Sequence, residues 1–197
     1  AGGYSFYKDA KERRITRYRY NNIPYDRGGR YIYVKDKETS KFWSVSWQPT
    51  NIAEKDGYQY ECRHGLGYTV IQSTYENIHT RTTYFVPLNE DLEIWKCEIT
   101  ALPEGGRGTR ELSVFSFIEF CLWDALNDMT DYQYNLNIGE TEFKNGIIYN
   151  ISRNRVDGPF RAYFMPTNAR VLSYDTQRRE FLGAYGDLSA PEARAPR

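Results

Sequence analysis

Carboxylate, amide and phenol side chains crowd one segment of the sequence, residues 124–137. Such groups donate and accept the hydrogen bonds that sugar hydroxyls require. Composition alone leaves two interpretations open, a sugar-binding surface and a polar surface loop with Asx turns. A calcium loop is disfavoured, because the spacing of Asp124, Asp128 and Asp131 lacks the glycine and the terminal glutamate of the Ca²⁺-binding pattern.

Glu119 is a second candidate, because it is the one charged residue in the apolar run of residues 112–123. Both alternating faces of this run are apolar, so we predict a central strand that is covered on both sides. A buried carboxylate costs several kcal/mol unless it is paired or protonated. We therefore expect an arginine or backbone amides to bind Glu119. The alternative is a carboxylate that works as an acid.

The chain has two histidines, His64 and His79, and three cysteines, Cys62, Cys97 and Cys121. A metal site is not expected, because no C-x-x-C or H-E-x-x-H spacing occurs. His64 could activate a nucleophile only with a Ser or Cys partner in space, and the sequence names none, so we favour a hydrogen-bonded structural histidine. The odd count of cysteines, and the strand-like settings of Cys97 and Cys121, indicate buried free thiols in a reducing compartment.

Short strands are the elements that must position these side chains. Alternation in residues 92–100 predicts a strand whose buried face carries Glu93, Trp95, Cys97 and Ile99. About ten to twelve such strands, with turns between them and no long helix, indicate an all-β fold, an antiparallel β-sandwich.

Two turns between these strands have a clear chemistry. Asn145-Gly146 predicts a hairpin on a type I′ turn, and a second hairpin is expected around Glu76-Asn77. In contrast, residues 175–183 predict a short helical turn or loop.

The overall balance of charge and hydropathy excludes several classes of partner. The 197 residues carry no net formal charge, which argues against a nucleic-acid or anionic-membrane partner. No apolar run approaches the roughly 18 residues that a membrane-spanning helix needs, and no export leader is visible. A single domain of this length buries about 70% of its unfolded surface, so a large core is available.

Five stretches, in order along nearly the whole chain, carry a resemblance to a known family. They are Ala1-Gly-Gly-Tyr-Ser-Phe-Tyr-Lys-Asp-Ala10, Arg17-Tyr-Arg-Tyr-Asn-Asn22, Arg63-His-Gly-Leu-Gly-Tyr68, Phe115-Ser-Phe-Ile-Glu-Phe-Cys-Leu-Trp123 and Phe181-Leu-Gly-Ala-Tyr185. The sequence resembles the amino-terminal domain of the cellobiose phosphorylase family, the inverting disaccharide phosphorylases of glycoside hydrolase family 94. These enzymes split a β-glucosidic disaccharide with inorganic phosphate, a co-substrate, to give α-glucose 1-phosphate and a free sugar.

The resemblance implies a galactose-mutarotase-like supersandwich at residues 1–188 and a tail or linker at residues 189–197. It also implies a cytoplasmic homodimer without a cofactor. The catalytic aspartate and the phosphate site belong to an (α/α)₆ barrel that these residues do not contain. We therefore expect no catalytic residue in this chain and no activity from the chain alone.

The resemblance further implies that part of the sandwich reaches across the dimer to the acceptor-sugar site of the partner subunit. That part falls in residues 124–135, where close relatives read Phe-Cys-Leu-Trp-Asn and Tyr-Gln-Arg-Asn. This sequence has Asp124 in place of the Asn and Tyr134 in place of the Arg, and it keeps Gln133. We predict Asp124, Gln133 and Tyr134 as substrate-binding residues. Their changes leave the disaccharide open among cellobiose, laminaribiose, cellobionate and chitobiose.

Two other functions compete with this interpretation. A stand-alone carbohydrate-binding module would bind sugar as a monomer through exposed tryptophans, whereas Trp43, Trp47, Trp95 and Trp123 sit in strand patterns and are expected mostly in the core. A purely structural dimerisation domain would place no side chain near the sugar.

Overall fold

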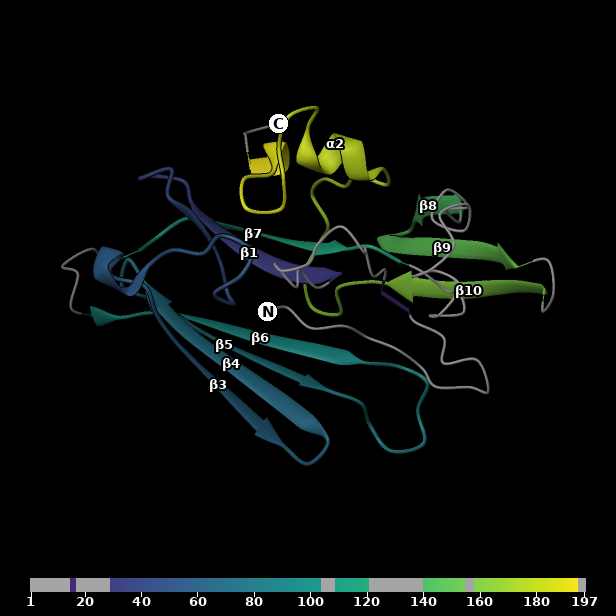
Figure 1. Cartoon of the computed structure of the whole chain (residues 1–197), viewed down its shortest axis with the longest axis horizontal. Coiled ribbons are helices and arrows are strands. Elements are labelled where there is room, and N and C mark those ends of the chain that lie inside the picture. The colour runs from purple at the N-terminus through teal and green to yellow at the C-terminus, as the bar shows by residue number, and fades with distance from the viewer. Residues whose placement is uncertain (1–14, 17–28, 104–108, 121–139, 155–157, 195–197) are drawn as a thin grey trace. The chain divides into compact units, whose positions relative to one another are not determined.

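A computed structural model of the chain describes residues 15–16, 29–103, 109–120, 140–154 and 158–194. The described residues form an all-β structure with one five-residue helix, as expected, and with three-residue 3₁₀ turns (Figure 1). The elements are β1 (Arg30–Asp36), β2 (Phe42–Ser44), η2 (Glu54–Asp56), β3 (Gln59–Gly65), β4 (Tyr68–Tyr75), β5 (Ile78–Phe85), β6 (Ile94–Ala101), β7 (Leu112–Ile118), β8 (Glu140–Lys144), β9 (Ile147–Asn154), β10 (Gly158–Phe164), α2 (Arg178–Leu182) and η5 (Glu192–Arg194).

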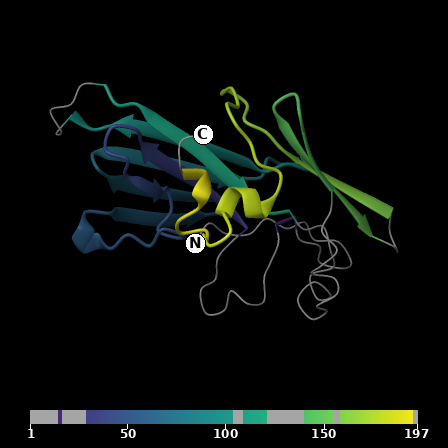
Figure 2. The same ribbon diagram turned by 90° about the horizontal axis from the view of Figure 1, so that it is seen from above.

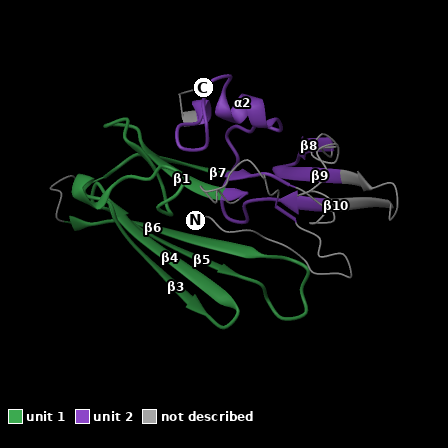
Figure 3. Ribbon diagram, viewed as in Figure 1, with its two compact units in different colours: residues 1, 31–116 green, residues 2–30, 117–197 purple. Residues whose placement is uncertain are grey.

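The described strands form three sheets, in the orders β2-β1-β7, β3-β4-β5-β6 and β10-β9-β8. Neighbouring strands in each sheet pair antiparallel. For the pair formed by β1 and β7, two backbone hydrogen bonds beyond the strand ends show the antiparallel direction. Lys37 N donates to Glu111 O at 3.0 Å and Glu119 N donates to Gly29 O at 2.8 Å. The chain divides into unit 1, residues 1 and 31–116, and unit 2, residues 2–30 and 117–197 (Figure 3).

Both predicted hairpins are confirmed. Glu76 and Asn77 have φ of 51° and 59° in the β4–β5 turn, and Asn145 and Gly146 have φ of 53° and 82° in the β8–β9 turn. Two successive positive φ values define the type I′ geometry, whose twist matches that of the flanking strands. These turns could be predicted because a few neighbouring residues decide them.

Unit 1 is a sandwich of two sheets around one core. Ile32, Val34 and Trp43 come from the β2-β1-β7 sheet, and Ile78 comes from the four-stranded sheet. Strand β6 turns its predicted face inward, because Trp95, Cys97 and Ile99 pack against this core while Ile94, Lys96 and Glu98 are exposed.

The register of the four-stranded sheet places rows of side chains on the same inner face. Cys97 of β6 lies opposite Thr82, Thr82 opposite Ile71, and Ile71 opposite Cys62 of β3. Directly paired residues share a face. Strand β3 therefore turns Cys62 toward the core side of the sheet. Even so, its first six residues are all exposed, and it lies at one end of the strand order.

The expectation that residues 112–123 form a doubly covered central strand is wrong for the described part. Strand β7 ends at Ile118, lies at one end of its sheet order, and leaves Val114 52% exposed. The middle position belongs to β1, in which six of seven residues are buried. An apolar composition on both faces of a strand does not by itself place covering layers over it.

Unit 2 contains the β8-β9-β10 sheet, α2 and η5. In Figure 2, α2 and η5 lie next to each other at the yellow end of the colour scale. Helix α2 buries Phe181 and Leu182, and it falls within the segment predicted to form a helical turn. Leu188 and Pro191 are also buried, on either side of the predicted domain end, so the boundary between residues 188 and 189 stays a prediction.

Candidate functional site

The three predicted acceptor-sugar residues, Asp124, Gln133 and Tyr134, lie outside the described residues. Trp123 and the discarded calcium set, with Asp128 and Asp131, lie outside them as well. The structure describes the chain on both sides of residues 121–139, up to Phe120 and again from Glu140. The described contacts nearest to these residues in the sequence are those at the end of β7.

The backbone leading into the predicted segment is tied down immediately before it. Phe120 forms an antiparallel bridge with Thr16, and Glu119 N donates to Gly29 O at 2.8 Å. Thr16 is fully buried and Phe120 is 9% exposed. These contacts fix the backbone of Glu119 and Phe120, the last described residues before the predicted segment.

Glu119 is paired with an arginine, as expected. Arg178 Nε lies 3.3 Å from Glu119 Oε2, and the Glu119 side chain is only 15% exposed. The ring centroids of Phe117 and Phe181 are 4.9 Å apart, so an apolar contact accompanies the ion pair. Helix α2 thus braces the end of β7, and this contact explains Glu119 as a structural anchor rather than as an acid.

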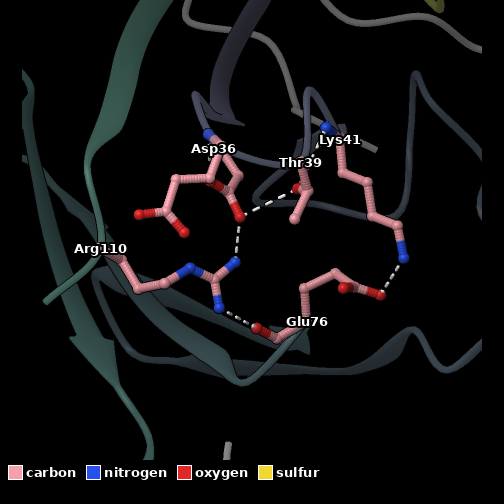
Figure 4. Close-up of polar contacts among 6 residues, drawn as sticks. Asp36, Thr39, Lys41, Glu76 and Arg110 are labelled. Atoms are coloured by element: carbon pink, nitrogen blue, oxygen red, sulfur yellow. Dashed lines mark hydrogen bonds and ion pairs between the residues drawn. The ribbon is translucent and has the colours of Figure 1, made fainter. Parts of the chain in front are cut away.

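A buried polar network joins three turns of unit 1 (Figure 4). Asp36, at the end of β1, is fully buried. Its Oδ2 accepts hydrogen bonds from Arg110 Nη2 and, at 2.9 Å, from Thr39 Oγ1, while Oδ1 accepts one from Glu38 N at 2.9 Å. The second terminal nitrogen of Arg110, Nη1, donates to Glu76 O at 3.1 Å.

The same network has a solvent-exposed extension. Lys41 Nζ donates to Glu76 Oε1 at 2.6 Å and lies 5.9 Å from the centroid of the Tyr75 ring. The β1–β2 turn, the β4–β5 turn and the approach to β7 are therefore held together by Asp36 and Arg110. Because every contact serves a turn, we interpret the network as a structural element of the sandwich.

Opposing effects act on the pKa of Asp36. Burial alone raises this pKa. The hydrogen bond from Arg110, joined by those from Glu38 N and Thr39, outweighs burial, so the pKa lies below its ordinary value of 3.8. The carboxylate is therefore ionised at neutral pH and available to hold Arg110.

The tryptophans divide between core and surface. Trp43 is fully buried, and Trp95 is partly buried with its Nε1 donating to Glu93 Oε1 at 2.5 Å. Trp47 is 38% exposed and stacks on Tyr60, which is 47% exposed, with ring centroids 6.3 Å apart. The expectation of core positions is thus confirmed for Trp43 and wrong for Trp47.

His64 has the cysteine neighbour that the sequence did not name. Cys62 Sγ lies 3.5 Å from His64 Nε2, and His64 Nδ1 lies 3.0 Å from Thr69 Oγ1. Cys62 is a free, exposed thiol rather than a buried one, whereas the free thiol of Cys97 is partly buried. The sequence signal that would have identified this neighbour is the length of the strand that carries Cys62. Strand β3 continues through His64, and residues two apart on a strand share a face.

Within the described ranges, the structure contains neither a cluster of metal-binding side chains nor a membrane-spanning helix. No group of three or more His, Cys, Asp or Glu side chains there could hold a metal ion. No helix among the same residues has the length and apolar character to cross a lipid bilayer.

The sequence matches one known protein family along nearly its whole length. Residues 1–196 match the family model described as the supersandwich domain of glycosyl hydrolase 94. The chain is 39% identical, over 98% of its length, to the N,N′-diacetylchitobiose phosphorylases of Vibrio proteolyticus and Vibrio furnissii. It is 32% identical, over 83% of its length, to the solabiose phosphorylase of Paenibacillus borealis.

These relatives are much longer than the chain. It spans 24% of each Vibrio protein and 20% of the Paenibacillus protein. The match to the family model nevertheless covers nearly every residue, and the antiparallel sandwich of the structure agrees with it. The chain belongs to the glycosyl hydrolase 94 family, as its amino-terminal supersandwich domain.

Proposed function

We propose that this chain is the non-catalytic sandwich part of an inverting disaccharide phosphorylase, and that it contributes to a homodimer and to the acceptor-sugar site of the partner subunit. The observation that carries the proposal is the match of residues 1–196 to the supersandwich domain, together with the 39% identity to two phosphorylases. Inorganic phosphate is a co-substrate, and the enzyme uses no cofactor.

The chemistry explains why the sandwich needs no reactive group of its own. In inverting transfer, a carboxylic acid protonates the leaving oxygen while the nucleophile attacks the opposite face of the sugar. Phosphate arrives already anionic, so no second carboxylate has to act as a base. The acid and the phosphate site belong to the helical barrel, and the sandwich contributes binding and position.

N,N′-diacetylchitobiose is the disaccharide that we favour. Two relatives at 39% identity carry this substrate in their names, whereas the solabiose phosphorylase is more distant at 32%. Phosphorolysis would then give N-acetylglucosamine 1-phosphate and N-acetylglucosamine. Where close relatives have an arginine, this chain has Tyr134. The change removes a planar set of hydrogen-bond donors and supplies an aromatic ring that can stack on a pyranose.

The cytoplasm is the proposed location. Cys62 and Cys97 are both free thiols, as expected in a reducing compartment. Inorganic phosphate is also available there as co-substrate.

The decisive experiment uses the whole phosphorylase that carries this domain. Tyr134→Arg should change the ranking of acceptor sugars in the synthetic direction more than it changes the rate at saturating acceptor. Gln133→Ala should raise the KM for the acceptor. Glu142→Gln, an exposed change in β8, is the control and should alter neither. An unchanged acceptor ranking in Tyr134→Arg, together with an unchanged KM in Gln133→Ala, would instead support a purely structural dimerisation domain.

A stand-alone carbohydrate-binding module is the second candidate, and the exposed Trp47–Tyr60 stack is the observation that favours it. Titration calorimetry on the isolated chain separates the two proposals. Saturable binding of N-acetylglucosamine oligomers by a monomer, abolished in Trp47→Ala, would support the module. Absence of binding heat, with phosphorolysis of N,N′-diacetylchitobiose found only in the whole enzyme, would support the phosphorylase domain.

A further inference from the structure

A thiol, an imidazole and a hydroxyl meet on the exposed edge of the four-stranded sheet, away from the network around Asp36. Cys62 and His64 lie two residues apart on β3, and His64 is directly opposite Thr69 of β4 in the register. Their contacts are 3.5 Å from Cys62 Sγ to His64 Nε2 and 3.0 Å from His64 Nδ1 to Thr69 Oγ1. Paired strands hold all three groups, so their spacing does not depend on a flexible loop.

The charged neighbours on β3 point to the other face of the sheet. Glu61 and Arg63 alternate with Cys62 and His64, and Arg63 Nε donates to Glu61 Oε1 at 2.8 Å. Glu61 and Arg63 pair with each other on that other face, and the basic group of β3 on the same face as the Cys62 thiol is the imidazole of His64. Cys62 and His64 are both exposed, so a reagent in solution can reach the sulfur atom.

The arrangement is that of an activated nucleophile: a thiol, a base within reach of it, and a third group that orients the base. With Nδ1 protonated, His64 donates to Thr69 Oγ1 and presents its Nε2 lone pair to the thiol. We propose that Cys62, His64 and Thr69 form a reactive thiol site that is modified by small-molecule disulfides.

The reaction is thiol–disulfide exchange, and its atoms and electrons balance. The Cys62 proton moves to His64 Nε2 as the sulfur attacks one sulfur of the disulfide. The S–S bond of the reagent breaks, a mixed disulfide forms on Cys62, and the departing thiolate takes the proton from His64. Cys62 is oxidised, one half of the reagent is reduced, and no further oxidant is needed.

Cys97 is an internal reference in the same sheet row. Two strands, β4 and β5, lie between it and Cys62, which is on the same face, and Cys97 Sγ accepts a hydrogen bond from Thr82 Oγ1 at 3.4 Å. Burial raises the pKa of the Cys97 thiol, and the partner of its sulfur among the described residues is a hydroxyl, that of Thr82, rather than an imidazole. The two thiols lie in the same sheet, but Cys62 is exposed to solvent and has an imidazole beside it, whereas Cys97 is partly buried and has a hydroxyl beside it.

The experiment follows glutathione disulfide adducts on the folded chain by peptide mass spectrometry. Trypsin separates the three cysteines, because cleavage after Lys or Arg yields residues 56–63, 97–107 and 111–144. We expect the adduct on residues 56–63 to form at least about tenfold faster than the adduct on residues 97–107. His64→Asn should slow the reaction of Cys62 about tenfold, in keeping with loss of a general base.

The sheet contains a matched control for the histidine. His79 Nδ1 lies 3.0 Å from Thr74 Oγ1 in a cross-strand pair like that of His64 and Thr69. His79→Asn should therefore leave the rate at Cys62 unchanged. Thr69→Val removes the orienting hydroxyl with little change in shape, and it should slow Cys62 severalfold.

Circular dichroism verifies that each variant is folded before its rates are compared. The proposal is overturned if Cys62 reacts no faster than Cys97. It is also overturned if His64→Asn reacts as fast as the unchanged chain, or if His79→Asn slows Cys62 as much as His64→Asn does. Should His64→Asn not fold, Thr69→Val decides alone, and an unchanged rate at Cys62 counts against the site.

Discussion

Replacing Arg110 by methionine removes the cation that faces the buried Asp36 while keeping much of the apolar stem. The Arg110 side chain is 8% exposed and that of Asp36 is 0% exposed, so solvent cannot take the place of the lost guanidinium. Breaking a buried ion pair from one side costs about 3–5 kcal/mol. Asp36 keeps its bonds to Glu38 N and Thr39 Oγ1, which argues for the low end, about 3 kcal/mol.

A second contact is lost in the same variant. Arg110 Nη1 no longer donates to Glu76 O, and a hydrogen bond of this kind contributes about 1 kcal/mol. We therefore expect Arg110→Met to lower the free energy of unfolding by about 4 kcal/mol, a large share of the roughly 5–15 kcal/mol of an ordinary domain. Urea unfolding, followed by tryptophan fluorescence to which the buried Trp43 contributes, measures this difference.

The pH dependence tests the cause. In the unchanged chain the pKa of Asp36 is lowered, so its contribution to stability is present above the ordinary value of 3.8 and is lost as the pH falls through the lowered pKa. In Arg110→Met, burial without the cation should raise that pKa, and protonation then relieves the cost. The difference between the two proteins should consequently shrink from pH 7 toward pH 4.

An exposed ion pair between neighbouring residues is the control. Lys37 and Glu111 each adjoin a member of the buried pair, and their side chains are 47% and 71% exposed. Glu111→Gln should cost at most about 1 kcal/mol, because solvent screens such pairs. A loss in Arg110→Met no larger than that in Glu111→Gln, or one that stays constant from pH 7 to pH 4, would refute the reasoning.

Two further predictions concern a turn and a buried phenol. Gly146→Ala should lower the free energy of unfolding by about 1–2 kcal/mol, because φ is 82° there, and an unchanged urea midpoint would contradict it. Nothing lies within 4 Å of the added Cβ, so the cost is conformational alone. Tyr58→Phe should cost about 1–3 kcal/mol, because the hydroxyl donates to Ser44 O at 2.9 Å, and loss of the donor leaves that carbonyl unpaired. Burial raises the pKa of Tyr58 above its ordinary value of 10.0. The contribution of Tyr58 to stability is therefore complete below pH 10.0 and is lost as the pH rises through the raised pKa. If the unchanged chain and Tyr58→Phe lost stability identically at alkaline pH, this prediction would be contradicted.

Local patterns predicted the features that local chemistry decides. The Asn145-Gly146 turn follows from residues that tolerate positive φ, and the inward face of β6 follows from strict alternation. The short helix α2 also falls within residues 175–183, where the sequence predicts a helical turn or loop. In each case the deciding residues lie within a few positions of one another.

For contacts between distant segments, the sequence can predict the type of residue that a side chain needs as a partner, but not which residue supplies it. An arginine was expected for Glu119, and the fold supplies Arg178 from 59 positions away in the sequence. The Asp36–Arg110 pair joins residues 74 positions apart and was not foreseen at all. The exposure of Trp47 and of Val114 depends on which strands cover them, which composition does not record.

The order of amino acids is enough to predict the all-β class, both hairpins, the type I′ turn at Asn145-Gly146 and the family, since each rests on neighbouring residues or on matches along the chain. The assembled fold is needed to place β1 rather than β7 in the middle of its sheet, and to place His64 beside Cys62 on an exposed strand. Register and layer coverage are set by the free energy of packing whole sheets, and any one segment contributes only part of that energy.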